Sequence, residues 1–235
     1  LGMVTISEDS DMDIVGVNTA GSADLDSTGA ISDAGATSLD ATMLADVAGT
    51  SISLGGGTFN AGTLTFNSAG AVVISEDSDM DIVGVNTAGS ADLDSTGAIS
   101  DAGATSVTVT GLTDAAGTSI TLGGGTFDSG TLTFNSAGNV AITEDSAMHV
   151  QAASTALGLT LDANGHLTQE NVATITSTTA TFRVSTAGPD DADVLLEFAN
   201  NEVSVAVAFE EVNADALRDV RFRNVSLTAQ WPTTP

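Results

Sequence analysis

Hydrophobic and polar residues alternate along most of the chain, in short runs that glycine and other turn-forming residues separate. Leu64 and Phe66 alternate with threonine and asparagine, and Val203, Val205 and Val207 alternate with serine and alanine. A period of two with threonine, valine and isoleucine indicates half-buried β-strands. No stretch combines a 3.6-residue apolar period with helix caps, so the pattern predicts an all-β protein.

The strand pattern is duplicated along the chain, and the copy that begins at Ile6 begins again at Ile74. Residues 6–38 are identical to residues 74–106 over 33 positions, and residues 39–70 match residues 107–138 at 23 of 32 positions. A third copy begins at Ile142 and soon diverges. The offset stays constant throughout, which means that no loop has been inserted between the copies.

This duplication predicts two regions. Residues 1–150 are expected to form a solenoid of 68-residue repeats, which run over residues 6–73 and 74–141 with a third copy from residue 142. Residues 151–235 keep the alternation without the repeat, so we expect degenerate coils and a C-terminal tail.

Three shorter segments add to this picture of two regions. Residues 1–4 align with residues 69–72, so the chain begins in mid-repeat, and we expect it to be a fragment of a longer array. The Gly-Pro-Asp-Asp sequence at residues 188–191 predicts a loop, and residues 231–235 are expected to be a short frayed end.

Duplication without insertion favours a solenoid among the all-β architectures. A closed sandwich cannot absorb a second copy without a second domain, whereas a β-helix only becomes longer. Similar segments within the repeat indicate coils of roughly 20 residues, which predicts a parallel, right-handed β-helix of roughly ten coils. The two identical segments are expected to lie on the same side of the rod, about three coils apart. The residues expected to be buried are Met12, Ile14, Leu25, Leu64, Met80, Ile82, Leu93 and Leu132.

Composition narrows the functions that such a rod could serve. The 235 residues include four Arg, no Lys, no Cys and 31 acidic residues, and the formal net charge is −27 at pH 7. Nucleic-acid binding needs clustered basic residues, and anionic membrane surfaces would repel this charge. The absence of Cys excludes a disulfide scaffold and a Cys-ligated metal, and no apolar run is long enough to span a membrane.

Three segments resemble a known family: GTLTFNSAGAVVISEDSDMDI, TSITLGGGTFDSGTLTFNSAGNVAITED and ADVLLEFANNEVSVAVAFEEVNADALRDVRFRNVSLTA. They are similar to the coils of filamentous-haemagglutinin-like β-helical exoproteins, including the giant repeat-rich surface adhesins of aquatic bacteria. The resemblance implies a right-handed parallel β-helix, secretion to the cell surface and a stalk or adhesive role. It offers no catalytic motif.

An acidic run in both copies is the strongest candidate for a ligand site. Its aspartates are Asp9, Asp11, Asp13, Asp77, Asp79 and Asp81. On a strand, alternate aspartates share one face, and a hard cation such as Ca²⁺ would relieve their repulsion. The run lacks the glycine and the bidentate glutamate of an EF-hand, and the third copy has Ala147 and His149 at two Asp positions. A calcium site and a solvated acidic surface both stay open.

Other polar residues favour structural roles. His149 and His166 are isolated in the sequence. The three glycines at residues 55–57 predict a turn, because no Lys or helix follows them as in a phosphate-binding loop. Outward acidic ladders are expected at Asp24, Asp26, Asp92 and Asp94. Stacked asparagine ladders are expected at Asn18, Asn67, Asn86 and Asn135.

These observations predict a structural and adhesive segment, a stalk or spacer, of a large secreted or surface-displayed bacterial repeat protein. We expect no enzymatic activity, because residues 1–182 contain no Lys or Arg for lyase chemistry and a duplicated surface argues against one unusual groove. The expected location is the extracellular side of the bacterial surface, and the expected partners are surface glycans, other surface proteins and further repeats. The alternative is a calcium-dependent carbohydrate- or surface-binding module.

Overall fold

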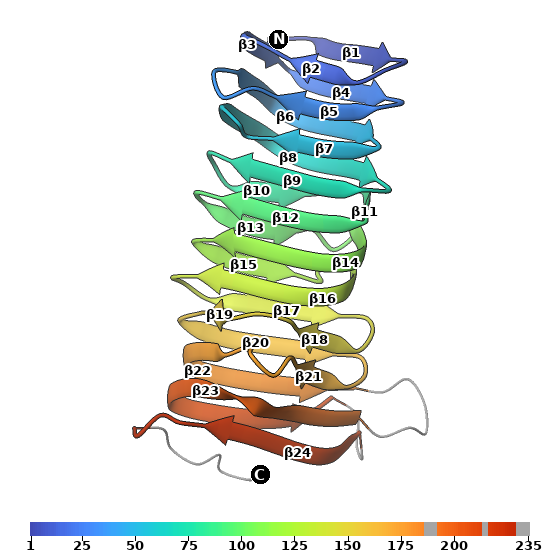
Figure 1. The fold of residues 1–235 in the computed structure, drawn as a ribbon. Coiled ribbons are helices and arrows are strands. Elements are labelled where there is room, and N and C mark those ends of the chain that lie inside the picture. The colour runs from blue at the N-terminus through green and yellow to red at the C-terminus, as the bar shows by residue number, and fades with distance from the viewer. Residues whose placement is uncertain (186–191, 213–215, 229–235) are drawn as a thin grey trace.

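The computed structural model describes residues 1–185, 192–212 and 216–228, and these residues form a β-solenoid of about 11 turns (Figure 1). The fold is all-β with 73% strand, as predicted, and no helix occurs among the described residues. The strands are β1 (Met3–Glu8), β2 (Met12–Ile14), β3 (Val17–Ala20), β4 (Ser22–Ser27), β5 (Ala30–Asp33), β6 (Ser38–Gly49), β7 (Ser51–Leu54), β8 (Thr58–Ser68), β9 (Ala71–Glu76), β10 (Met80–Ile82), β11 (Val85–Ala88) and β12 (Ser90–Ser95). They continue as β13 (Ala98–Asp101), β14 (Ser106–Gly117), β15 (Ser119–Leu122), β16 (Thr126–Ser136), β17 (Val140–Glu144), β18 (Met148–Val150), β19 (Ser154–Thr155), β20 (Gly158–Ala163), β21 (Leu167–Gln169), β22 (Ile175–Val184), β23 (Ala192–Glu211) and β24 (Leu217–Asn224).

Every strand pairing in the described residues is parallel, because each coil lies directly on the one before it. β1 pairs with β4, β4 with the second half of β6, and that half with the second half of β8. The spacing of successive partners in this column confirms the expected coils of roughly 20 residues. β6 and β8 each contribute to two sides of the coil, and the register between them shifts between Ala41 and Leu44, where the chain turns the corner.

One hydrophobic core runs along the rod from Met12 to Val207. It forms because alternate strand residues point inward, as in β8, where Phe59, Leu64 and Phe66 are fully buried. The predicted burial is confirmed for seven of the eight residues: Met12, Leu25, Leu64, Met80, Ile82, Leu93 and Leu132. Ile14 is partly buried and packs against the same core.

The two identical segments lie on different sides of the rod, and the prediction that they share one side is wrong. One column of stacked residues runs through Val4, Ala23, Ala45, Leu64 and Ile82. A second column runs through Met12, Ile31, Ile52, Val72 and Ala91.

Each side of the first copy is therefore followed in the second copy by the next side of the coil. Val4 belongs to the first column, whereas its counterpart Val72 belongs to the column of Met12. A third column runs from Val17 through Ser38 to Thr58. The counterpart of its strand β3 is β11, which pairs with the β8 half of the first column. The repeat therefore takes a little more than three coils of roughly 20 residues each, and the second copy is turned by about one side of the coil.

The glycine triplet forms a tight corner, as predicted. Gly55 has a φ of +103°, and a Cβ at this position would lie 2.3 Å from the backbone oxygen of Ser75 in the next coil. Its counterpart Gly123 has a φ of +94° and would meet Thr143 in the same way. A side chain at either position would be strained and would push the coils apart.

The C-terminal coils continue the solenoid with longer strands, such as β22 and β23. Phe182 and Phe209 stack with their ring centroids 5.7 Å apart, and Phe222 lies 5.6 Å from Phe209. The loop expected at residues 188–191 and the tail expected at residues 231–235 lie outside the described residues. Within the described part of the chain, no helix is long and apolar enough to cross a membrane.

Candidate functional site

The acidic run forms a turn between two strands, so the prediction that its aspartates share one face of a strand is wrong. In the first copy Asp9 and Asp11 lie between the end of β1 and the start of β2, and only Asp13 belongs to a strand. In the second copy Asp77 and Asp79 lie between β9 and β10. The turn directs consecutive aspartates toward different coils.

Each aspartate of the second copy accepts a hydrogen bond from a neighbouring coil. Asp77 Oδ2 accepts from the Phe59 amide at 3.2 Å in the coil before. Asp79 Oδ1 accepts from the Ala98 amide at 2.8 Å, and Asp81 Oδ1 accepts from the Ser100 hydroxyl at 3.2 Å, both in the coil after. These contacts hold coils together.

The first copy repeats the contacts with the following coil only. Asp11 Oδ1 accepts from the Ala30 amide at 2.9 Å, and Asp13 Oδ1 accepts from the Ser32 hydroxyl at 3.1 Å. Over the described residues no group of three or more His, Asp or Glu side chains is placed to hold a metal ion. Calcium binding by these aspartates stays a prediction.

The third copy keeps part of this arrangement with different residues. His149 replaces the aspartate at position 81, and its Nδ1 lies 2.8 Å from the Thr168 hydroxyl, the counterpart of Ser100. His166 accepts a hydrogen bond from the Asp193 amide at 3.0 Å. Both histidines therefore bridge adjacent coils.

Two buried glutamates are the least expected polar groups of the structure. Glu76 and Glu144 occupy equivalent positions at the ends of β9 and β17, and they are 2% and 1% exposed. Glu76 Oε1 accepts from the Ala61 amide at 2.8 Å, and Glu144 Oε1 accepts from the Ser129 amide at 3.0 Å. The second carboxylate oxygen of each glutamate is buried and has no hydrogen-bond partner.

Burial of these carboxyl groups disfavours their charged form. It raises the pKa of Glu76 to about 7, against the lowering effect of the Ala61 amide and the Ser78 hydroxyl. It also raises the pKa of Glu144 to about 7, against the corresponding donors Ser129 and Ser146. Repulsion from nearby aspartates contributes to the raised pKa of both glutamates.

Sequence reasoning missed these glutamates, because a glutamate next to an aspartate in a turn looks solvent-exposed. One signal was present: Glu, Asp and Ser are retained at residues 144–146 of the third copy, whereas two later aspartates are replaced by Ala147 and His149. Positions that persist while their neighbours change are those with contacts to the preceding coil.

The four asparagines expected to form ladders do not stack on one another, so that prediction is wrong. Asn86 lies beside Val107, and Asn67 lies beside Thr87. Asn86 is fully buried, and its Oδ1 accepts from the Phe66 amide at 2.9 Å while its Nδ2 donates to the Val83 carbonyl at 3.0 Å. It ties three segments of backbone together.

Acidic side chains stack in adjacent coils at two of the four predicted positions. Asp24 lies beside Asp46, and Asp92 lies beside Asp114, in adjacent parallel strands. Asp26 and Asp94 lie beside serine and alanine. Burial, followed by repulsion from the neighbouring aspartates, raises the pKa of Asp46 and of Asp114.

The C-terminal coils place arginine in the same kind of ladder. Asp162, Arg183 and Glu210 lie side by side, and Arg183 Nε donates to Glu210 Oε2 at 2.7 Å. Arg218 Nε donates to Asp193 at 2.9 Å, and this bond lowers the pKa of Asp193.

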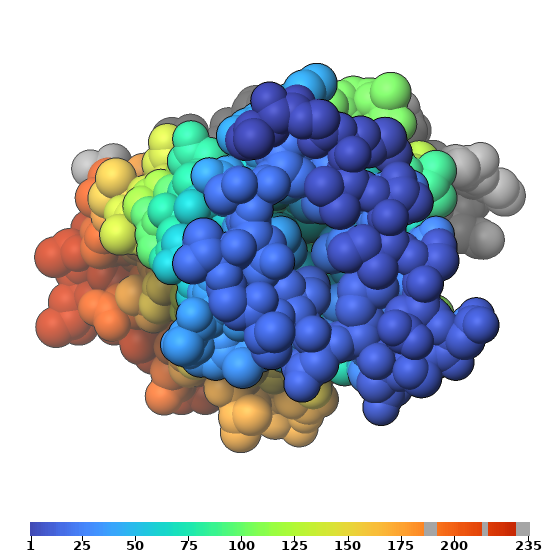
Figure 2. Space-filling view, turned by 90° about the horizontal axis from the view of Figure 1, so that it is seen from above, coloured from blue at the N-terminus to red at the C-terminus, as the bar shows by residue number. Residues whose placement is uncertain are grey.

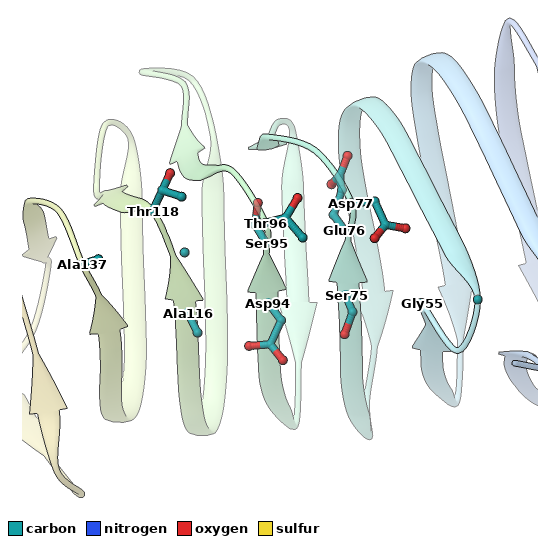
Figure 3. Close-up of a pocket in the computed structure, with 12 residues that line it drawn as sticks. Gly55, Ser75, Glu76, Asp77, Asp94, Ser95, Thr96, Ala116, Thr118 and Ala137 are labelled. Atoms are coloured by element: carbon teal, nitrogen blue, oxygen red, sulfur yellow. The ribbon is translucent and has the colours of Figure 1, made fainter.

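Figure 3 shows a shallow groove that crosses several coils at the ends of their strands. Its polar lining is Ser75, Glu76, Asp77, Asp94, Ser95, Thr96 and Thr118, with glycine and alanine between them. An equivalent groove is lined by the matching residues of the first copy, including Ser7 and Asp26. The volumes are about 410 and about 430 Å³. Hydroxyl and carboxylate groups over small residues could receive a sugar chain.

The profile of a family described as repeats of unknown function (DUF5649) matches residues 137–210. This segment covers the third copy and much of the degenerate region. Comparisons with curated proteins and with solved structures find no match. The chain is a repeat protein with a β-solenoid fold, and the resemblance to haemagglutinin-like adhesins stays a prediction.

Proposed function

We propose that the chain is a rigid spacer in the stalk of a secreted or surface-displayed bacterial repeat protein, and that it is not an enzyme. The observation that carries this proposal is the unbroken stacking of coils through both copies into the C-terminal region (Figure 1). About 11 coils at the spacing of about 4.8 Å give a rod about 50 Å long.

The repeat organisation suits a spacer because length is added without a new fold. Each coil contacts the coils on either side, so a further copy extends both the core and the strand columns. The surplus of carboxylates keeps the outer surface hydrated and disfavours lateral association. Adhesion would then depend on surface glycans or surface proteins that contact the sides or the end of the stalk.

Removing one repeat tests the spacer function. Deletion of residues 74–141 joins Val73 to Ile142 in the repeat register and should shorten the rod by about 16 Å, since a little more than three coils are lost. Small-angle scattering should show this change in maximum dimension with an unchanged cross-section. A compact particle, or one of unchanged length, would contradict the proposal. Antibody labelling and fractionation of cells that make the full-length protein test its location.

The paired grooves favour one second candidate, a calcium-dependent carbohydrate-binding module. Their presence on both copies would allow one rod to bind a glycan twice. A glycan array probed with calcium and with chelator tests this candidate, with Asp94→Ala and Asp26→Ala as the variants that remove one carboxylate from each groove. Equal signals in calcium and in chelator exclude a calcium-dependent module.

A further inference from the structure

The turn between β20 and β21 contains the only Asn-Gly pair in the sequence, Asn164 and Gly165. We call this pair, together with the following His166, the Asn-Gly turn. Asn164 is exposed and Gly165 is half-buried. The turn belongs to the later coils, which extend beyond the outline of the N-terminal coils when the rod is viewed along its length (Figure 2).

The two earlier copies of this turn show which of its positions is fixed. The residue before the glycine donates its amide to a glutamate carbonyl one coil earlier, at 2.9 to 3.0 Å, in all three copies: Thr28 to Glu8, Thr96 to Glu76 and Asn164 to Glu144. Glycine follows in every copy, at residues 29, 97 and 165. The threonine of the first two copies is therefore replaced by asparagine in the third, while the backbone contact is kept.

The glycine is retained because the preceding coil lies too close for a side chain. A Cβ at Gly97 would lie 2.1 Å from Asp79 Oδ1, and a Cβ at Gly165 would lie 3.1 Å from the Cα of Ala147. An asparagine at residue 164 is thus followed by the one residue that leaves its side chain unhindered.

The side chain of Asn164 is held only by long contacts. Its Nδ2 donates to the Asp145 carbonyl at 3.4 Å, and the Ser185 hydroxyl donates to its Oδ1 at 3.4 Å. Both distances exceed the usual range of about 2.7 to 3.2 Å for hydrogen bonds from an N–H group and the shorter range for hydroxyl donors. The carboxamide can therefore rotate toward the Gly165 amide at little cost.

This pair of residues can react with itself and with water. The backbone nitrogen of Gly165 attacks the Cγ of Asn164, and a bond forms between them. The bond from Cγ to Nδ2 breaks, and this nitrogen leaves as ammonia with the proton that the amide gave up. Water then opens the resulting succinimide at either of its carbonyl groups, which gives aspartate or isoaspartate without any oxidant or reductant.

We propose that the Asn-Gly turn is a site of covalent self-modification, at which Asn164 becomes aspartate and isoaspartate in the folded protein. Isoaspartate inserts one extra carbon into the backbone before Gly165 and displaces His166. That residue connects both adjacent coils, because its carbonyl accepts from the Met148 amide at 2.8 Å and its Nδ1 accepts from the Asp193 amide at 3.0 Å. The modification loosens the rod where the third copy passes into the degenerate coils, and it is independent of the spacer function.

The test incubates the 235-residue chain at pH 6 and at pH 8, followed by peptide mapping with mass spectrometry and isoaspartate detection. The mass change of asparagine to aspartate should appear at Asn164 in two products. Its rate should rise by up to about tenfold per pH unit, because the deprotonated amide nitrogen is the attacking group. Asn164→Thr restores the residue of the other copies and should abolish the reaction.

Two further measurements connect the reaction to the turn and to its structural effect. Asn171 is exposed like Asn164 but precedes the β-branched Val172, so it should stay unmodified in the same sample. Amide exchange at Met148 and Asp193 should become about tenfold faster in the incubated protein, because their acceptors on His166 are displaced. Incubated Asn164→Thr protein should show no such change.

Four outcomes would overturn the proposal. Intact Asn164 in the folded chain, under conditions that convert a synthetic LDANGHLT peptide, would show that the fold prevents the reaction. Equal conversion of Asn171 would assign the reaction to exposure alone. Aspartate without isoaspartate would indicate direct hydrolysis that does not involve Gly165. Unchanged amide exchange in fully converted protein would exclude the loosening of adjacent coils.

Discussion

Residues 6–38 and residues 74–106 have one sequence and two environments. Ile6 is 45% exposed, whereas Ile74 is fully buried. Glu8 is exposed, whereas Glu76 is 2% exposed. The largest difference lies on the preceding side: the coil formed by β7 and β8 precedes the second copy, whereas β1 of the first copy pairs with β4 alone among the described strands.

This comparison shows that a coil acquires its burial from its neighbours. The strand pattern decides which side chains point inward, and the adjacent coil decides whether they are removed from water. Identical substitutions in the two copies therefore measure the contribution of one coil–coil interface. The following predictions use matched pairs of this kind, from the largest expected effect to the smallest.

The largest difference is expected for a charge placed in the core. Ile74→Asp puts an unpaired carboxylate between two coils and should lower the free energy of unfolding by roughly 4 kcal/mol or more. Ile6→Asp leaves the carboxylate at the open end and should cost less than about 1 kcal/mol. Denaturant unfolding of both variants measures the difference, and equal losses would contradict the assignment of Ile6 to an open edge.

The pH dependence of stability should be assigned to the buried glutamates. Their folded-state pKa of about 7 lies above the ordinary value of 4.5, so the folded state binds these protons more tightly than the unfolded state. The free energy of unfolding should therefore fall between pH 4.5 and pH 7, by up to about 3 kcal/mol for each group.

Substitution by glutamine tests whether this pH dependence comes from the buried glutamates of the second and third copies and not from the exposed glutamate of the first. Glu76→Gln with Glu144→Gln should flatten the stability profile between pH 4.5 and pH 7, because no proton is then released at these positions. Glu8→Gln is the matched control and should leave the slope unchanged, since Glu8 is exposed. Thermal melts at half-unit pH intervals measure the slope, and a slope that survives the double substitution would contradict this account.

The buried asparagine gives a smaller difference. Asn86→Ala leaves the buried Phe66 amide without its acceptor and should cost about 2 kcal/mol. Asn18→Ala should cost about 1 kcal/mol or less, because Asn18 keeps only its bonds to local carbonyls and to Ser38. Equal losses from the two variants in urea unfolding would show that the Phe66 contact contributes nothing.

Much of this fold could be predicted from sequence because each strand carries its own alternation. Leu64, Phe66 and their neighbours indicate inward positions without knowledge of the partner strand, and the constant offset between copies identifies a solenoid. The side on which the second copy lies could not be predicted, because coil length varies with the corners: Val4 lies beside Ala23, and Ala23 lies beside Ala45. A small error per coil accumulates along the repeat and changes the side on which a copy lies.

The polar positions were harder to predict for a related reason. Burial of Glu76 depends on the Ala61 amide, which is 15 residues earlier in the chain and one coil away. Local sequence describes the turn that contains Glu76 and does not describe what covers it. The aspartates of the same turn form separate hydrogen bonds to different coils, and those bonds likewise depend on contacts between coils that local sequence does not describe.

The smallest prediction concerns a position where the two copies have similar surroundings. Asp46 and Asp114 both lie away from the ends of the rod, and each has another aspartate beside it in the adjacent strand. Burial, followed by repulsion from that aspartate, raises the pKa of both. Asp46→Asn and Asp114→Asn should each stabilise the protein by about 0.5 kcal/mol at pH 7, because a like-charge pair is removed. The gain should shrink in 1 M salt, where charges are screened within about 3 Å. Unequal gains in the two copies would show that the difference between them extends beyond the first coil.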